Sequence, residues 1–227
     1  MAGLPPDVPG PGQLLAAARA TPGFMPDDEG LALVRLAARA AGARLGPVVE
    51  IGAYCGRSTL YLAAGLASCP QRDPACVLFS VDHHRGSEEL QAGWPHHDPS
   101  LVDPATRRMD TLGRWRAAVA GAGAEGLVVG VVGESGLVAA SWARPLGLVF
   151  VDGGHAPDVV ARDYRSWAPL VAPGGVLAFH DVFADPALGG QGPHRCYEDA
   201  LASGRYRALD GEGAGSLRAL EALPGPP

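Results

Sequence analysis

The sequence predicts an α/β fold in which helices cover both faces of a doubly wound, mainly parallel sheet. Short apolar runs alternate with helical segments along most of the chain, which is the order typical of parallel strands joined by helices. Polar residues directly follow several of these runs, and such sheets bind ligands at the carboxyl ends of their strands. We therefore expect the polar residues to meet in one crevice: Asp82, Ser135, Asp152, His180 and Asp181.

Length and composition describe one domain with a sizeable core. The chain has 227 residues, 47% hydrophobic and 19% charged, as in ordinary globular proteins. The formal net charge is −6 without a long basic run, so we expect no nucleic-acid partner, which would need a Lys/Arg surface. No stretch reaches the roughly 18 apolar residues of a membrane span, and the first residues lack a signal-peptide pattern. A cytoplasmic location is the resulting expectation.

The amino-terminal part is expected to be helical after a flexible start. Residues 1–12 are rich in Pro and Gly and are expected to be flexible. Residues 13–47 form a helical segment, with helices over 13–19 and 31–41. The run Pro26-Asp27-Asp28-Glu29 supplies the proline and the acids that favour a helix start.

Residues 48–227 carry the alternation of strands and helices and are expected to form the main domain. The closing part could add a pair of strands, over 206–209 and 216–220. Hydrophobic patterns predict strands over 48–51, 76–81, 127–132, 148–151 and 176–179, and helices over 58–66, 112–120, 137–142, 159–170 and 197–202.

The segment of about 84–111 has little periodicity. A patternless connection of this length is more often a functional lid than a plain linker. It contains Trp94 and three histidines, His84, His96 and His97. These histidines could bind a substrate or act as a base, or they could simply be solvated.

A glycine motif follows the strand predicted over 48–51. Gly52 and Gly56 bracket the turn before the next helix, where glycine lets the backbone approach a ligand closely. The spacing differs from the GxGxxG of dinucleotide folds, and no P-loop lysine follows, which disfavours NAD and ATP. Glu50 lies within the apolar strand and needs buried partners. An ordinary tight turn is the alternative.

Asp82 ends the next predicted strand, roughly 30 residues after Gly52. A carboxylate in that place can accept hydrogen bonds from the hydroxyls of a ribose, whereas the alternative is a loop cap. His83 beside it could pack on an adenine or be solvated.

Asp152, His180 and Asp181 follow two strands that we expect to be parallel neighbours. Carboxylates close together raise each other's pKa unless a cation neutralises them. Carboxylate oxygens with one imidazole suit Mg²⁺ or a similar divalent ion. The competing interpretation is a metal-free pocket lined by hydrogen-bonded polar residues.

His155 lies three residues after Asp152, at the turn toward the next helix. Histidine titrates near neutral pH and can take a hydroxyl proton. We interpret His155 as a general base, although a lone histidine is often structural.

The ordered set of motifs resembles class I S-adenosylmethionine-dependent methyltransferases. The Glu50-to-Ser58 turn, Asp82 and Asp152-Gly-Gly-His155 carry the first likeness. Asp163-Tyr164, Leu170-x-x-Pro173-Gly-Gly175 and His180-Asp181 make it similar to the small bacterial sugar and macrolide O-methyltransferases. The likeness spans roughly residues 24–185. The lid and the chain length also look like actinobacterial methyltransferases of methylated-polysaccharide biosynthesis.

The resemblance implies a Rossmann-like, seven-stranded sheet whose last strand is antiparallel. It implies that Asp82 holds the cofactor's ribose, with His83 beside it, and that Asp152 lies next to the cofactor. It further assigns the methionine part of the cofactor to Glu50, Gly52, Tyr54, Gly56 and Ser58, and the adenine to Gly133, Glu134 and Ser135.

Metal-dependent catechol-type O-methyltransferases offer a second resemblance. They place an acid after strand four, a lysine base three residues later, and an acid–amide pair after strand five. Asp152, His155 and His180-Asp181 fall at these places. Histidine thus replaces the lysine, and His180-Asp181 replaces the acid–amide pair, so the departure concerns His180 more than the two acids.

The expected function is methyl transfer from S-adenosylmethionine to a hydroxyl of a sugar or oligosaccharide, assisted by Mg²⁺ or a similar ion. The alternatives are methylation of a small phenol or natural product, and a cofactor-binding module without chemistry. A homo-oligomer is a further expectation.

Overall fold

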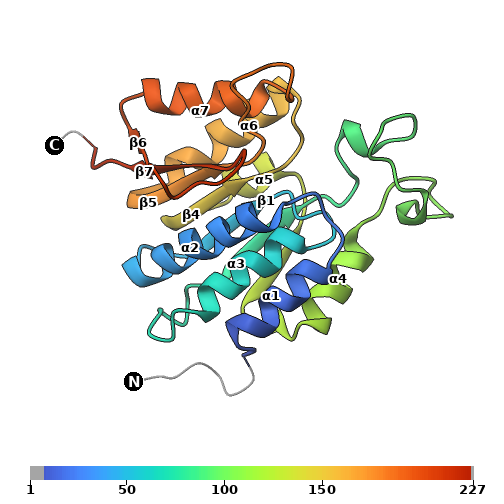
Figure 1. The fold of residues 1–227 in the computed structure, drawn as a ribbon, viewed down its shortest axis with the longest axis horizontal. Helices are drawn as coiled ribbons and strands as arrows, with labels where there is room; N and C mark the ends of the chain where they lie inside the picture. The colour runs from blue at the N-terminus through green and yellow to red at the C-terminus, as the bar shows by residue number, and fades with distance from the viewer. Residues whose placement is uncertain (1–7, 226–227) are drawn as a thin grey trace.

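A computed structural model describes residues 8–225. The protein has three layers, with a seven-stranded sheet between two layers of helices (Figure 1). The strand order is β3-β2-β1-β4-β5-β7-β6. Strands β1 to β5 are parallel, and β7 runs antiparallel to both β5 and β6. The predicted Rossmann-like sheet with an antiparallel last strand is therefore confirmed. The strands are β1 (Val48–Ile51), β2 (Leu78–Asp82), β3 (Val128–Val132), β4 (Leu146–Val151), β5 (Val171–Phe179), β6 (Tyr206–Ala208) and β7 (Arg218–Ala222).

The central strands are apolar on both faces, because helices cover both sides of the sheet. In β4, Leu148 and Phe150 belong to the core on one face, whereas Val149 and Val151 belong to the core on the other. The first core is shared with α1 (Pro11–Ala20), α2 (Asp27–Ala43), α3 (Arg57–Ala67) and α4 (Leu112–Gly121). The second is shared with α5 (Ser135–Ala140), α6 (Pro157–Trp167) and α7 (Gly192–Ala202).

Helix α2 packs on the sheet, and both α1 and α2 pack on α3. Helix α1 begins at Pro11, two residues earlier than predicted, with the proline in its first turn, where a missing N–H costs nothing. Pro26 precedes α2, whose first turn is acidic as predicted. Residues 1–7 of the expected flexible start lie outside the described residues, and the division at residue 47 stays a prediction.

Strand β5 differs most from its prediction. It begins at Val171, five residues before the predicted start, and includes the Pro173-Gly174-Gly175 segment predicted as a turn. The pairing with β4 is irregular here, because the register shifts between Leu146 and Leu148. Glycine with positive φ at residue 174 allows this bend within a strand.

The predicted lid lies beside the sheet as a long excursion between β2 and α4 (Figure 1). It contains two short 3-10 helices, η1 (Glu88–Leu90) and η2 (Pro99–Leu101), and one antiparallel bridge. Leu101 and Met109 form a small separate core with Cys55 of the β1–α3 turn. The lid is therefore anchored on the turn that carries the glycine motif.

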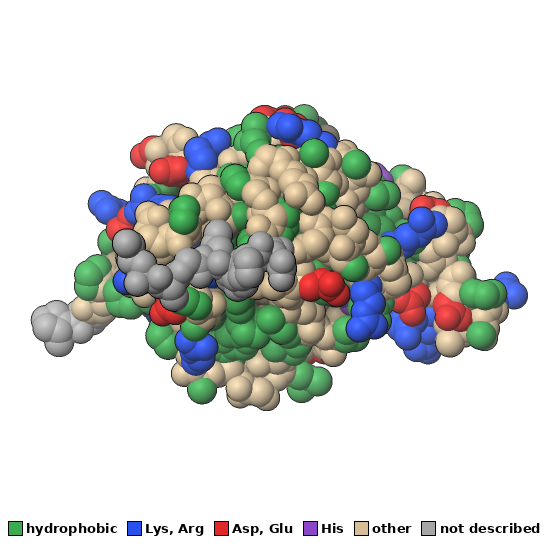
Figure 2. Space-filling model, turned by 90° about the horizontal axis from the view of Figure 1, so that it is seen from below, with side chains coloured by type: hydrophobic (Ala, Val, Ile, Leu, Met, Phe, Trp, Pro, Cys, Tyr) green, Lys and Arg blue, Asp and Glu red, His purple; other side chains and the backbone are tan. Residues whose placement is uncertain are grey.

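Charged side chains of both signs are interspersed on the face shown in Figure 2. Within residues 8–225, none of the helices combines the length and apolar character needed to cross a bilayer. All four cysteines are buried free thiols.

The topology fixes where a ligand can bind. Strands β2 and β3 lie on one side of β1, while β4 and β5 lie on the other. The strand order thus reverses between β1 and β4, and the crevice at such a point receives the carboxyl ends of the strands.

We expect Gly52→Ala to destabilise the protein by about 3 kcal/mol or more. Gly52 has φ +85°, and a Cβ there would lie 2.2 Å from the carbonyl oxygen of Asp152. Thermal unfolding measures the change. Gly211→Ala is the matched control, because Gly211 has φ +80° with no atom within 4 Å of a Cβ, so only about 1–2 kcal/mol of backbone strain is expected. Equal losses in the two variants would contradict the close β1–β4 approach.

Candidate active site

One cavity of about 830 Å³ lies at the carboxyl ends of the strands. Its volume is at the upper end for small-molecule sites. Glu50 and Gly56 are the two predicted site residues that do not line it. The other predicted residues all line it: Gly52, Tyr54, Ser58, Asp82, His83, Gly133, Glu134, Ser135, Asp152, His155, His180 and Asp181.

Asp82 shapes the glycine turn from the end of β2. Its Oδ2 accepts hydrogen bonds from the backbone N–H groups of Ala53 (2.8 Å) and Tyr54 (3.0 Å). Its Oδ1 accepts one from the N–H of His84 (2.6 Å). These bonds hold the β1–α3 and β2–lid turns together across the cavity. Oδ1 therefore keeps one lone pair, which can accept a hydrogen bond from a ribose hydroxyl.

Glu50 lies beneath this turn and is completely buried. Its Oε2 accepts hydrogen bonds from Thr59 (2.6 Å) and Ser80 (2.7 Å), whereas Oε1 has no partner. Burial raises the pKa of Glu50 to about 7, despite the hydroxyl hydrogen bonds and with a smaller contribution from the charge of Asp152. Glu50 therefore supports the turn from inside rather than from the cavity wall.

The segment after β3 is fixed by contacts with α6. Glu134 caps α5 by accepting from the N–H of Leu137 (2.9 Å). The indole of Trp167 donates to the hydroxyl of Ser135 (2.8 Å). Asp163, also on α6, is buried beside Ser135 and lines the cavity. Its carboxyl pKa is raised by burial.

His180 is held between three carboxylates at the end of β5. Its Nε2 donates to Glu29 of α2 (2.5 Å), while its Nδ1 lies 3.1 Å from Asp152 Oδ1 and 3.3 Å from Asp181 Oδ2. Burial opposes a charge on the ring, but the three acids outweigh it and hold the pKa of His180 far above its ordinary value. Both ring nitrogens of His180 thus face carboxylates, and its predicted role as a metal ligand stays a prediction.

His155 contacts carboxylates through both ring nitrogens. Nδ1 lies 2.9 Å from Glu89 Oε2 on the lid, and Nε2 lies 3.1 Å from Asp181 Oδ2. Nε2 is buried and makes no aligned hydrogen bond. When the ring is neutral and Nδ1 donates its proton to Glu89, Nε2 is the nitrogen that can accept a proton. Burial lowers the pKa of His155, but Glu89, Asp152 and Asp181 together raise it above its usual value.

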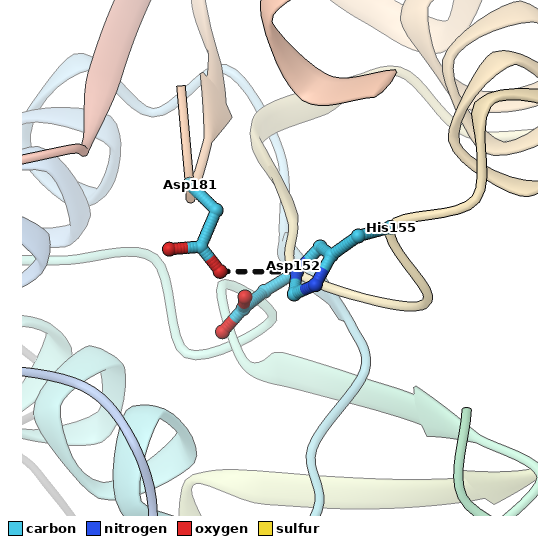
Figure 3. Close-up of side chains that lie close together, drawn as sticks. All are labelled: Asp152, His155 and Asp181. Carbon is cyan, nitrogen blue, oxygen red and sulfur yellow. Dashed lines mark ion pairs between the residues drawn. The ribbon is translucent and has the colours of Figure 1, made fainter. Parts of the chain in front are cut away.

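Asp152, His155 and Asp181 converge as a candidate metal centre (Figure 3). One potential ligand atom from each lies within 4.8 Å of the others. Two carboxylates and one imidazole suit several divalent ions. The histidine of this group is His155 rather than His180, and the predicted set of Asp152, His180 and Asp181 stays a prediction.

Three functional residues of this cluster were not predicted from the sequence. Glu29 and Ser216 support the floor, since Ser216 donates both its N–H (2.5 Å) and its hydroxyl (3.0 Å) to Glu29. Glu89 supports His155. These residues contact partners that lie 66 to 187 residues away along the chain. A local sequence pattern therefore could not predict their roles.

The cavity is strongly acidic. Seven carboxylates line it, against the two guanidinium groups of Arg57 and Arg162. A cavity lined mainly by one sign of charge attracts the opposite sign. The site therefore suits a ligand that carries positive charge.

The chain belongs to a family of methyltransferase domains. The family described as "Methyltransferase domain" matches residues 49–182, which covers the glycine turn, the strand ends and the candidate metal centre. The resemblance to methyltransferases expected from the motifs is confirmed.

Solved O-methyltransferases share the fold at low sequence identity. TomG from Streptomyces achromogenes, involved in tomaymycin synthesis and solved with S-adenosylmethionine, is 19% identical, with a TM-score of 0.61 over 94% of this chain and 89% of that one. An O-methyltransferase from Bacillus cereus, solved with S-adenosylhomocysteine, is 19% identical (TM-score 0.58, 94% and 92% covered). CalS11, a TDP-rhamnose 3′-O-methyltransferase of calicheamicin biosynthesis, is 15% identical (TM-score 0.61, 84% and 78% covered).

We expect Glu50→Gln to change how stability depends on pH. The folded pKa of Glu50 is about 7, against an ordinary 4.5, so the folded state holds its proton more tightly. This contribution is complete below pH 4.5 and is lost as pH rises to 7, by at most about 3 kcal/mol. Urea unfolding from pH 4.5 to 8 should show wild type losing stability relative to Glu50→Gln. Parallel curves would contradict the assignment of a protonated, buried Glu50.

Proposed function

We propose that this protein is an S-adenosylmethionine-dependent O-methyltransferase that uses a divalent ion and methylates a hydroxyl of a sugar or oligosaccharide. The observation that carries the proposal is the group formed by Asp152, His155 and Asp181 at the floor of an acidic cavity. Methyltransferase family membership supplies the reaction class.

The residues present suit the proposed cofactor. The backbone of Gly52 lies so close to Asp152 that no side chain would fit between them. Residue 52 therefore takes up no side-chain volume at this wall of the cavity. Asp82 would hold the ribose, and Gly133 to Ser135 would border the adenine. Glycine and serine at residues 52 and 58 would face the methionine part. The acidic lining favours a cationic sulfonium.

When bound, S-adenosylmethionine supplies an electrophilic methyl group on positively charged sulfur. The acidic lining of the cavity binds this cation more favourably than the neutral thioether of S-adenosylhomocysteine, which remains after the methyl group is transferred. The acidic cavity thus favours the substrate form of the cofactor over its product form.

The residues also suit a divalent ion. Asp152 and Asp181 offer carboxylate oxygens that lie close together in this group, beside Nε2 of His155. A bound ion would lower the pKa of an acceptor hydroxyl. His180 already neutralises part of the acidic charge from the other side, which limits the charge that an ion must balance.

His155 is the group best placed to move the hydroxyl proton. Glu89 holds Nδ1 and orients the ring, so that Nε2 can accept the proton on the cavity side. The lid residues around Glu89 close this side of the site. Alignment of the hydroxyl by the cavity walls supplies the remaining rate enhancement.

A sugar acceptor is supported by the likeness to CalS11, a TDP-rhamnose 3′-O-methyltransferase. The alternative is a small phenol or natural product, since TomG serves tomaymycin synthesis. An acceptor screen with glycosides and phenols separates these two, and a phenol preference would overturn the sugar proposal.

We expect His155→Ala to lower kcat by about 10²- to 10⁴-fold, the usual contribution of a general base. Binding of S-adenosylhomocysteine should stay unchanged. Steady-state kinetics on an acceptor found in the screen measures the first, and calorimetry the second. His194→Ala is the matched control, because His194 lies on α7 and does not line the cavity. Unchanged kcat in His155→Ala would remove the base from the proposal.

Chelation tests the ion separately. EDTA treatment followed by dialysis should abolish transfer, and Mg²⁺ or Mn²⁺ should restore it. Asp181→Asn should resist restoration, because an amide offers a weaker ligand. Full activity after chelation would leave a metal-free reaction with His155 as the base.

A further inference from the structure

Four side chains with rings surround one part of the cavity, and together they form what we call the aromatic rim. They are Phe24, Tyr54, Trp94 and His96, and all of them line the cavity. They come from the α1–α2 loop, the β1–α3 turn and the lid. Segments far apart in the sequence thus place rings in the lining of one cavity.

Three rings of the rim are in contact, with Phe24 between Tyr54 and His96. The ring centroid of Phe24 lies 5.4 Å from that of Tyr54 in a tilted arrangement and 4.9 Å from that of His96 in an edge-on arrangement. These are favourable geometries for aromatic pairs. Phe24 therefore connects the lid with the turn that carries the glycine motif.

Contacts with α3 fix the loop that carries Phe24. Arg57 at the start of α3 donates to the backbone oxygens of Arg19 (3.5 Å) and Thr21 (3.4 Å), which fixes the loop. Gly23 packs directly on the side chain of Arg57. Met25 is buried, whereas its neighbour Phe24 remains 57% exposed at the cavity.

The exposed rings of the rim indicate a binding site. Trp94 is 51% exposed and Phe24 slightly more, although both rings would gain by burial. Clustered exposed apolar side chains at a cavity mark binding sites, whereas single ones are ordinary. Leu137, 72% exposed on α5, is such a single case and does not line the cavity.

The cavity therefore offers two different surfaces. Its floor holds carboxylates and histidines, and its rim holds aromatic rings. We propose that the acceptor carries an aromatic ring that stacks on the rim while a sugar hydroxyl reaches the floor, so that its chemical class is an aryl glycoside. This inference rests on the proposed function for the hydroxyl, but the rim itself is independent of the reaction.

An aromatic ring fits the rim better than a bare sugar. Phe24 already uses ring contacts to Tyr54 and His96, and a further ring can join the cluster in the same tilted or edge-on manner. A pyranose also packs on an aromatic ring through the C–H bonds of one face, but it lacks the π-system that forms tilted and edge-on ring pairs.

The experiment compares phenyl β-D-glucopyranoside with methyl β-D-glucopyranoside. Calorimetry measures binding of each to protein saturated with S-adenosylhomocysteine. We expect the phenyl glycoside to bind about tenfold more tightly or better. Phe24→Ala and Trp94→Ala should each remove most of this preference, whereas Phe24→Tyr should keep it. Leu137→Ala is the control and should change nothing.

Three results would overturn the inference. They are equal affinity for the two glycosides, no binding of the phenyl glycoside at millimolar concentration, and a preference that survives both alanine variants. Binding of S-adenosylhomocysteine should be equal in all variants, which shows that they are folded. Failure of wild type to bind S-adenosylhomocysteine would instead overturn the proposed function, so the two failures are distinguishable.

Discussion

The ion-paired ring of His180 is the contact on which the site depends. It joins Glu29 of α2 to Asp152 of the β4 end and Asp181 of the β5 end, and Ser216 before β7 completes the group. Three acids this close would repel one another strongly without a cation between them. Removing one partner of a buried ion pair typically costs about 3–5 kcal/mol. The amino-terminal helix layer is therefore part of the active-site floor.

A second constraint is the close approach of backbone at Gly52. The absence of a side chain lets β1 and the segment after β4 meet, and Asp82 then draws the N–H groups of Ala53 and Tyr54 toward β2. Tyr54 adopts a left-handed conformation with φ 47°, which Asp82 helps to hold. The same turn carries Cys55, on which the lid packs. The glycine turn, the lid and the floor of the cavity are thus connected by direct contacts.

The fold could be predicted from the sequence because alternation and apolar runs are local signals. Strand ends placed Asp82, Asp152 and Asp181 around one cavity, as expected. The role of His180 could not be predicted, because its main partner, Glu29, is 151 residues away. The role of Glu89 could not be predicted for the same reason, because its partner His155 is 66 residues away and the lid has no periodicity. Glu50 was correctly expected to need buried partners, but its distance from the cavity wall depends on strand orientation, which spacing alone does not give.

The most direct test of the account is calorimetric titration of S-adenosylhomocysteine into wild-type protein and Asp82→Asn. Asp82 both lines the cavity and holds the glycine turn. Losing hydrogen bonds to a charged acceptor costs about 1.5–3 kcal/mol. We expect one binding site in wild type and an affinity weaker by about tenfold or more in the variant. No binding to the wild-type protein would contradict the assignment of the cavity to a methyl donor.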